Sequence, residues 1–282
     1  MLATTNGRSE RIEAMSQYRP INDDHAVENV DFQLIFDGNV APALFSLAQA
    51  NHHEWREELP ALQVGALQGV EGLPATFTAG LAFSYLRPDG SPAWQMRFDP
   101  QTLTVTCGRY TRWVRVWSDA RSLLEKALGL FAKDESLSAR KIAAIRLQVG
   151  DRFEVPETEW SPDGLLRRDG EYLPLAVFGA GAVWHNNTGW FEQEHGLGAI
   201  LHNLNVASSR KEALIPTSSL ITIGLTHLQE LRVKDHVDVS AALETLDAIM
   251  EHFHQSNKQL VSKVLVEAAC DQIGLWGTKR GE

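Results

Sequence analysis

The sequence predicts an α+β fold with two halves, each a mainly antiparallel sheet meander packed against helices. Three observations support this prediction. Short runs of alternating apolar and polar residues follow one another at 80–107, with tight turns between them. Helical patterns come after the strands in both halves, an order typical of α+β folds. A stretch rich in Gly and Pro at 157–182 has no strong periodicity and separates the halves.

The length of 282 residues allows one large domain or two small ones, and 44% hydrophobic with 22% charged residues is typical of a globular chain. We expect a mobile N-terminal arm at 1–19, an N-terminal α+β half at 20–160 and a C-terminal α+β half at 161–282 that ends in two helices. A meander followed by helices occurs twice, which hints at a duplication, but no residue-level repeat is visible.

The central stretch at 142–156 is the strongest strand prediction. Ile145, Leu147 and Val149 alternate with polar residues, which indicates a half-buried strand with one polar face. Pro156 ends this strand because it has no N–H to donate. The other elements predicted for the first half are strands at 27–36, 80–86, 93–98, 103–107 and 110–117, a helix at 42–59, and a helix at 118–133 capped by Ser118 or Asp119.

The second half is predicted to contain three strands, followed by two helices. The strands are at 183–192, 199–208 and 220–231. The first helix is capped by Asp238 or Ser240. The second helix carries an apolar stripe from Leu260 to Ala269, and Gly274 ends it.

An aromatic-rich segment leads into a helix and then into the central strand. The residues of this pattern are Trp113, Trp117, Leu147, Asp151, Arg152, Phe153 and Pro156. The order resembles a sporadically distributed bacterial family of uncharacterised proteins, roughly as long, whose strand carries a run similar to I-x-L-R-Y-x-x-R-F-x-x-P. Gln148 stands where that family has an aromatic residue, and a second match runs from Leu243 to His254. The resemblance implies no activity and no catalytic residues, and it suits an accessory protein in a defence or mobile-element context.

The formal net charge is −10, so we do not expect a broad basic face that binds nucleic acid. Cys107 and Cys270 are far apart, which argues against a disulfide scaffold and favours a reducing cytoplasm. The segment 1–19 lacks the apolar core of a secretory signal, and no run of about 18 apolar residues predicts a membrane span. We therefore expect a cytoplasmic protein.

Three histidines form the first candidate site, because His185, His202 and His227 lie one on each predicted strand of the second half. If these strands pair in register, the imidazoles converge on one face and make a polar ligand site. The alternative is that each is a cross-strand residue that faces water. His52 and His53 are adjacent and diverge on a helix, and no standard zinc spacing occurs, so no metal site is expected.

Arg146, Asp151 and Arg152 form the second candidate, a site for an anionic ligand. The alternative is that they make ion pairs that fix the register of the strand. Neither the glycine-rich loops that hold nucleotides nor the Gly-x-Ser-x-Gly turn of hydrolases occurs in the sequence. We therefore expect no cofactor.

Three functions remain open. The first is a cytoplasmic binding protein without catalytic activity that recognises a protein or a ligand through its sheet face, and its acidic charge suits a basic partner. The second is an enzyme with a small-molecule site between the halves that uses the strand histidines. A deep pocket with two of them within hydrogen-bond reach of each other or of a carboxylate favours it. The third is a homo-oligomeric scaffold protein built through the C-terminal helices.

Overall fold

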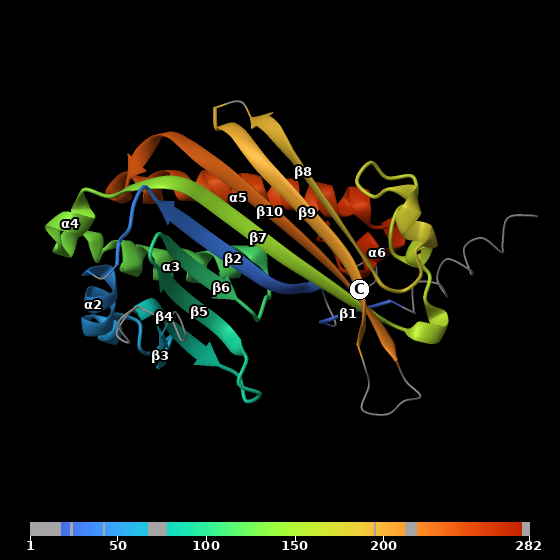
Figure 1. The fold of residues 1–282 in the computed structure, drawn as a ribbon, viewed down its shortest axis with the longest axis horizontal. Helices are drawn as coiled ribbons and strands as arrows, with labels where there is room; N and C mark the ends of the chain where they lie inside the picture. Colours follow the sequence, from blue (N-terminus) through green and yellow to red (C-terminus); the bar gives the residue numbers. More distant parts are fainter. Residues whose placement is uncertain are drawn as a thin grey trace, which may run out of the picture.

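The computed structural model describes residues 18–22, 25–41, 43–66, 78–194, 196–211 and 219–277. The fold is α+β, with a ten-stranded antiparallel sheet whose described helices lie on one face (Figure 1). The strands are β1 (Arg19–Pro20), β2 (Val27–Phe36), β3 (Ala61–Ala66), β4 (Thr78–Leu86), β5 (Pro92–Asp99), β6 (Thr102–Cys107), β7 (Lys141–Pro156), β8 (Trp184–Glu194), β9 (Gly198–Lys211) and β10 (Leu220–Asp238). The helices are α2 (Ala43–Ala50), α3 (Trp113–Leu128), α4 (Glu135–Ser138), α5 (Val239–Val264) and α6 (Glu267–Gln272).

Both predicted meanders belong to a single sheet. Its strand order is β3-β4-β5-β6-β2-β7-β10-β9-β8, and β1 pairs with β7 off this path. The two central strands, β2 and β7, pair with each other, and each also pairs with the last strand of the meander that follows it, β6 or β10. Strand β7 lies before residue 160 and pairs with β10, which lies after it, so the sheet continues across the predicted division. The division into two halves stays a prediction.

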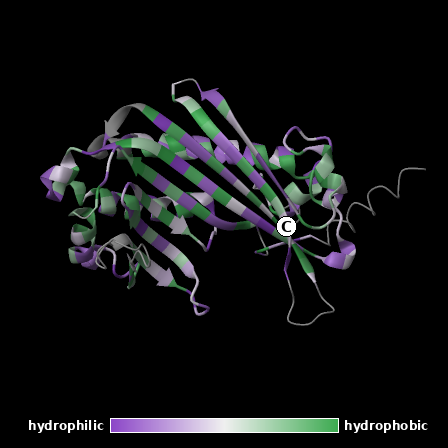
Figure 2. Ribbon diagram, viewed as in Figure 1, coloured by the Kyte–Doolittle hydropathy of each residue, from purple (hydrophilic) through white to green (hydrophobic). Residues whose placement is uncertain are grey.

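Strand β7 confirms the central strand prediction. Ile145, Leu147 and Val149 are buried on the face that the helices cover, whereas Arg146 and Gln148 lie on the other face. Figure 2 shows the same alternation of hydrophobic and hydrophilic residues along the neighbouring strands. The period of two in the sequence therefore reports which side chains face the core.

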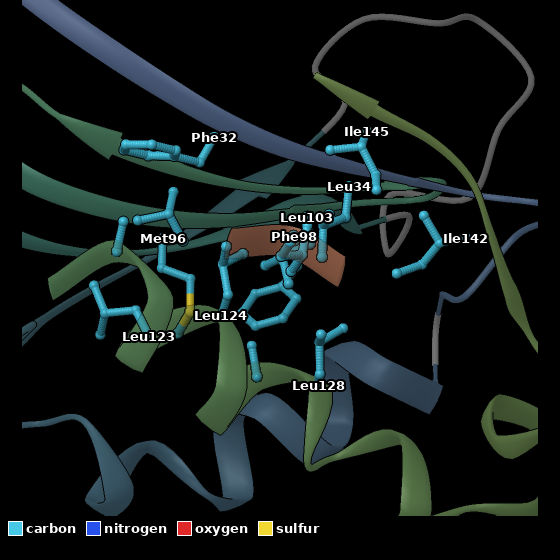
Figure 3. Packing of buried hydrophobic residues seen from close by; sticks show 14 of the residues in the cluster. Phe32, Leu34, Met96, Phe98, Leu103, Leu123, Leu124, Leu128, Ile142 and Ile145 are labelled. Atoms are coloured by element: carbon cyan, nitrogen blue, oxygen red, sulfur yellow. The ribbon is translucent and has the colours of Figure 1, made fainter. Parts of the chain in front are cut away.

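The apolar core is made of two clusters on the covered face of the sheet. The first cluster joins β2, β5 and β6 to α3, and Phe32, Phe98 and Leu124 are completely buried in it (Figure 3). The second joins β7, β9 and β10 to the end of α5, with Phe153 and Leu265 completely buried. Each such side chain contributes about 1.5–3 kcal/mol by leaving water.

The predicted strand at 110–117 is wrong, since α3 begins at Trp113. Trp113 and Trp117 alternate with Arg115, which is typical of a strand, but Trp113, Val116 and Ala120 also recur at helical spacing. All three of the latter residues are buried. The helical stripe continues through the whole of α3, so burial of a long apolar face decides the local structure. The predicted caps, Ser118 and Asp119, therefore lie inside the helix.

The two predicted C-terminal helices have different bounds. Helix α5 runs without a break to Val264, so Leu260 and Val261 belong to it and not to a second helix. Leu265 then adopts an extended conformation, with φ −88° and ψ 150°, and the short α6 follows. The predicted 42–59 helix likewise ends early, at Ala50, and Pro42 lies outside the described residues.

The ordered chain reaches into the predicted N-terminal arm. Tyr18 is 1% exposed, and its hydroxyl donates a hydrogen bond to the backbone carbonyl of Ser161. Arg19 pairs with Glu154 in the sheet. Positions 1–17 of the arm lie outside the described residues. The last two positions of the arm are therefore part of the packed fold.

Candidate functional site

The structure brings two of the three strand histidines together. His202 on β9 and His227 on β10 both point to the covered face of the sheet, and each is 2% exposed. They are diagonal neighbours, because His202 lies opposite Gln229 and His227 lies opposite Leu204. The prediction is wrong for His185, whose exposed side chain lies on the other face. His185 lies opposite Ala207 on β9, and Ala207 is five positions from His202. Side chains alternate along a strand, so Ala207, and with it His185, faces away from His202.

A chain of hydrogen bonds connects the histidine pair to α5. Nδ1 of His202 lies 3.1 Å from Nε2 of His227, and Nδ1 of His227 lies 2.9 Å from the amide oxygen Oδ1 of Asn257. An amide oxygen can only accept, so the proton of His227 sits on Nδ1 and its Nε2 must accept from His202. The proton of His202 is therefore on Nδ1, which leaves an electron pair on its Nε2.

Burial keeps both imidazoles neutral near pH 7. It lowers the pKa of His227 to about 4, against the opposing effect of the Asn257 hydrogen bond. Burial also lowers the pKa of His202, while the carboxylate of Glu192 raises it and His252 lowers it further. A charged imidazole would lose its hydration here, so the neutral form is favoured.

Aromatic rings form one side of the site. The indole of Trp190 on β8 is nearly parallel to the ring of His202, at 5° and 5.1 Å between centroids. Tyr172 lies 5.1 Å from the same indole, between ring centroids. Trp190 is opposite His202 in the β8–β9 register, which explains the contact. Both this stacking and the hydrogen bond to His227 restrict the orientation of the imidazole.

A pocket of about 260 Å³ opens beside His202. It is lined by Tyr172, Trp190, Glu192, Glu194, His202, His252, Gln255, Ser256, Gln259, Leu260 and Lys263. These residues all lie within 172–263, so the pocket is inside the predicted C-terminal half and not between the halves. Oε2 of Glu192 lies 3.3 Å from Nε2 of His202. The carboxylate is off the direction in which a ring nitrogen hydrogen-bonds, and no hydrogen-bond partner of this nitrogen occurs among the described residues.

The second candidate site does not assemble. Arg146 forms an ion pair with Glu230 on the uncovered face of the sheet, and Arg152 pairs with Glu28 at 2.6 Å. Hydrogen bonds from Arg232 and Arg146 lower the pKa of Glu230, although burial acts in the opposite direction. These pairs agree with the alternative reading, in which the arginines fix the register of the strands.

Asp151 points to the opposite face from Arg152. It is 6% exposed, between Val27 and Leu225 of the flanking strands. Burial raises the pKa of this carboxyl to about 7. Asp151 and Arg152 therefore cannot bind one anion together, because the sheet separates their side chains.

The remaining reactive groups are packed in the core. Cys107 and Cys270 are free and buried, and burial raises the pKa of each thiol to about 11. Within the described ranges, no group of three or more His, Cys, Asp or Glu side chains could hold a metal ion. Over the same residues, none of the helices has the length and apolar character needed to cross a membrane.

No protein-family model matches this sequence, and no curated protein matches it either. The resemblance to a sporadically distributed bacterial family therefore stays a prediction, and the function has to be argued from the site itself.

Sequence reasoning named His202 and His227 and missed the other residues of the site, of which Trp190, Glu192 and Asn257 contact these two histidines. Trp190 and Glu192 share one face of β8 with Thr188, and this alternation is visible in the sequence. Asn257 sits in the middle of α5, where asparagine is unfavourable unless its side chain has a partner. In the sequence, Asn257 falls at helical spacing between Phe253 and Leu260, and a polar residue in this apolar stripe is the signal that could have predicted a buried hydrogen bond.

Proposed function

We propose that this chain is a cytoplasmic binding protein without catalytic activity, and that the pocket beside His202 takes a small ligand. The observation that carries the proposal is the ring nitrogen Nε2 of His202. It is buried, it lacks a hydrogen-bond partner among the described residues, and it belongs to a side chain that lines the pocket. A buried polar atom without a partner costs about 1–3 kcal/mol, which a ligand that pairs with it would recover.

The pair of hydrogen-bonded histidines beside a carboxylate and a pocket is the arrangement expected of the alternative function, an enzyme that uses the strand histidines. Nucleophilic catalysis also needs a nucleophile within reach of the base and a group that orients the base. His227 is hydrogen-bonded to the amide of Asn257 and not to a carboxylate, so among the described residues no negative charge balances a charged imidazole at that end. In the described residues no hydroxyl or thiol is hydrogen-bonded to Nε2 of His202. These features favour binding over nucleophilic catalysis.

A fragment panel tests the small-ligand proposal by ligand-observed NMR. Ser256→Trp fills the pocket from α5, whereas Ser262→Trp places the same residue on the same helix outside the pocket lining. We expect fragments that bind the wild type and the Ser262→Trp variant to lose binding to Ser256→Trp. If no fragment binds the wild type, or if both variants bind equally, the pocket is not a ligand site.

We propose the uncovered face of the sheet as the site for a protein partner. A row of side chains crosses it in register, from Thr106 on β6 through Asp31 and Gln148 to Asn203 on β9. Thr106 donates to Asp31 at 2.7 Å and Gln148 donates to it at 3.2 Å, so the row is already ordered. Ordered polar groups lose little entropy on binding, which favours recognition.

Arginine substitutions test this second surface. Asn203→Arg and Thr226→Arg should abolish stoichiometric co-purification of a partner from the native cells, because both place a long charged side chain on the uncovered face. Arg115→Glu on α3, a similarly drastic change at an exposed position, should leave it intact. Equal recovery with all three variants contradicts the assignment of this face.

A scaffold built through the C-terminal helices has less support. Leu260, Val261 and Val264 are buried against the chain's own sheet, so the apolar stripe of α5 is already used within one molecule. The defence or mobile-element context rests on the family resemblance alone and stays a prediction.

A further inference from the structure

We propose that the ligand of the His202 pocket is a small organic ammonium compound, whose N–H group donates to Nε2 of His202 and whose charge lies beside Glu192. This inference rests on the proposed ligand-binding function and adds the chemical class of the ligand. Three independent features of the pocket lead to it: the direction of its hydrogen bonds, its charge and its aromatic wall.

The direction of the hydrogen bonds is set at α5. Asn257 presents an oxygen to His227, so each ring nitrogen along the chain that faces away from α5 is an acceptor. The chain ends at Nε2 of His202, which has Oε2 of Glu192 3.3 Å away. Two acceptors this close repel each other unless a donor bridges them from one side, because 3.3 Å leaves no room for an atom between them. A ligand N–H group is such a donor.

The charge of the lining favours a cation. Glu192 and Glu194 contribute two negative charges and Lys263 contributes one positive charge. The imidazole of His202 is neutral near pH 7, because burial lowers its pKa. The lining is therefore net negative, which disfavours a carboxylate or phosphate ligand. A bound metal ion is a less suitable occupant, because the described residues hold no cluster of ligands for one.

The aromatic wall adds a third contribution. Trp190 and Tyr172 both line the pocket, with 5.1 Å between their ring centroids. A cation over the face of Tyr172, or over the face of Trp190 that does not stack on His202, is attracted by the negative π-cloud of the ring. The volume of about 260 Å³ is smaller than the sites of drug-sized ligands, about 300–1,000 Å³, so the ligand is of fragment size.

Calorimetry with three probes of one shape tests the inference. Benzylammonium, benzyl alcohol and benzoate share a ring and differ in the head group. We expect benzylammonium to bind about tenfold more tightly than benzyl alcohol, since a charge-assisted hydrogen bond is stronger than a neutral one. Benzoate should bind most weakly of the three. Equal or tighter binding of benzyl alcohol or benzoate overturns the ammonium assignment but leaves the pocket as a ligand site.

A matched pair of charge variants checks where the ammonium group lies. Glu192→Gln should weaken benzylammonium about two- to fivefold, because an exposed ion pair is worth little. Glu244→Gln removes the same charge from the exposed side of α5, away from the pocket, and should have no effect. An equal loss in both variants would mean that only the net charge of the protein attracts the probe, which contradicts the inference.

The ring nitrogen gives a readout that does not depend on a destabilising variant. Benzylammonium should shift the ¹⁵N resonance of His202 Nε2 in the wild-type protein and leave that of the exposed His185 unchanged. Binding without a shift at His202 places the ammonium group elsewhere and overturns the inference. Failure of all three probes, together with failure of the fragment panel, rejects the pocket itself.

Discussion

Two tryptophan–histidine stacks in this protein have nearly the same geometry but different surroundings. Trp113 on α3 lies 4.2 Å from His254 on α5, with 3° between the ring planes, and Trp190 lies 5.1 Å from His202 at 5°. Burial lowers the pKa of both histidines, to about 4 for His254. The first stack joins two helices, whereas the second joins two strands at the edge of a pocket.

The residues around each stack determine whether it stabilises the fold or orients a side chain of the pocket. Trp113 also contacts Phe32 of the large apolar cluster, and its indole N–H donates to Glu251 at 2.9 Å, which holds α3 against α5. Trp190 instead stacks on His202, which also belongs to the hydrogen-bond chain that leads to α5. The same pair of rings therefore stabilises the fold in one place and orients a ring nitrogen in the other.

Removing each indole should separate the two roles, because one substitution should mainly lower stability and the other should mainly abolish ligand binding. Trp113→Ala should lower the free energy of unfolding by about 3–5 kcal/mol, because the side chain is 8% exposed and leaves a cavity beside Phe32. Trp190→Ala should cost about 1–2 kcal/mol, since its side chain is only half-buried, but it should abolish ligand binding. Denaturant unfolding measures the loss of stability in each variant. An equal loss in the two variants would contradict the different roles of Trp113 and Trp190.

A double-mutant cycle tests the hydrogen-bond chain that only the second stack has. His227→Leu and Asn257→Leu should each cost about 1–3 kcal/mol, because each leaves a buried polar partner unpaired. The double variant should cost clearly less than the sum of the two, since both partners are then apolar. Strict additivity would show that the two side chains do not interact.

The buried carboxyl of Asp151 on β7, the strand that both apolar clusters share, should make the stability of the protein depend on pH. Burial raises its pKa from 3.8 in the unfolded chain to about 7, so the folded state binds more protons between these values. Stability is then lost as the pH rises through this window. Asp151→Asn should stabilise the protein by about 1–3 kcal/mol near pH 8 and have little effect near pH 4. A variant that is less stable at both pH values contradicts the burial of a charged carboxylate.

His254→Phe should have the smallest effect near pH 7, within about 1 kcal/mol, because a flat ring still stacks on Trp113. The pKa of His254 is lowered from 6.5 to about 4, mainly by burial, with Glu251 raising it and Lys258 lowering it. The unfolded chain therefore binds more protons in this window, and wild-type stability falls as the pH falls from 6.5 to 4. The variant should fall less steeply in acid unfolding curves, and identical slopes would contradict the lowered pKa.

Much of the sheet could be predicted from the sequence, because alternation along a strand directly reflects which side chains are buried. β7 and the strands that carry His202 and His227 were predicted in this way. The start of α3 could not be, since Trp113 and Trp117 fit both a period of two and a helical stripe, and only packing against Phe32 decides between them.

The candidate site depends on information that a single strand does not contain. Whether His185 faces the same side as His202 follows from the register of β8 on β9, and a shift of one residue would reverse the answer. The partner of His227 is Asn257, which lies 30 positions later on a helix. The strand pattern therefore predicted that His202 and His227 belong to one site. The hydrogen bond from His227 to Asn257 could be seen only once the helix was packed on the sheet.

The protonation state of the His202 ring decides whether the pocket presents an acceptor to its ligand. Long-range ¹H–¹⁵N spectra near pH 7 distinguish a protonated ring nitrogen from a bare one. We predict a proton on Nδ1 of His202 and an electron pair on Nε2, because Asn257 presents an oxygen to His227. A proton on Nε2 would reverse the polarity of the whole chain and contradict the assignment of this pocket as an acceptor site for an ammonium ligand.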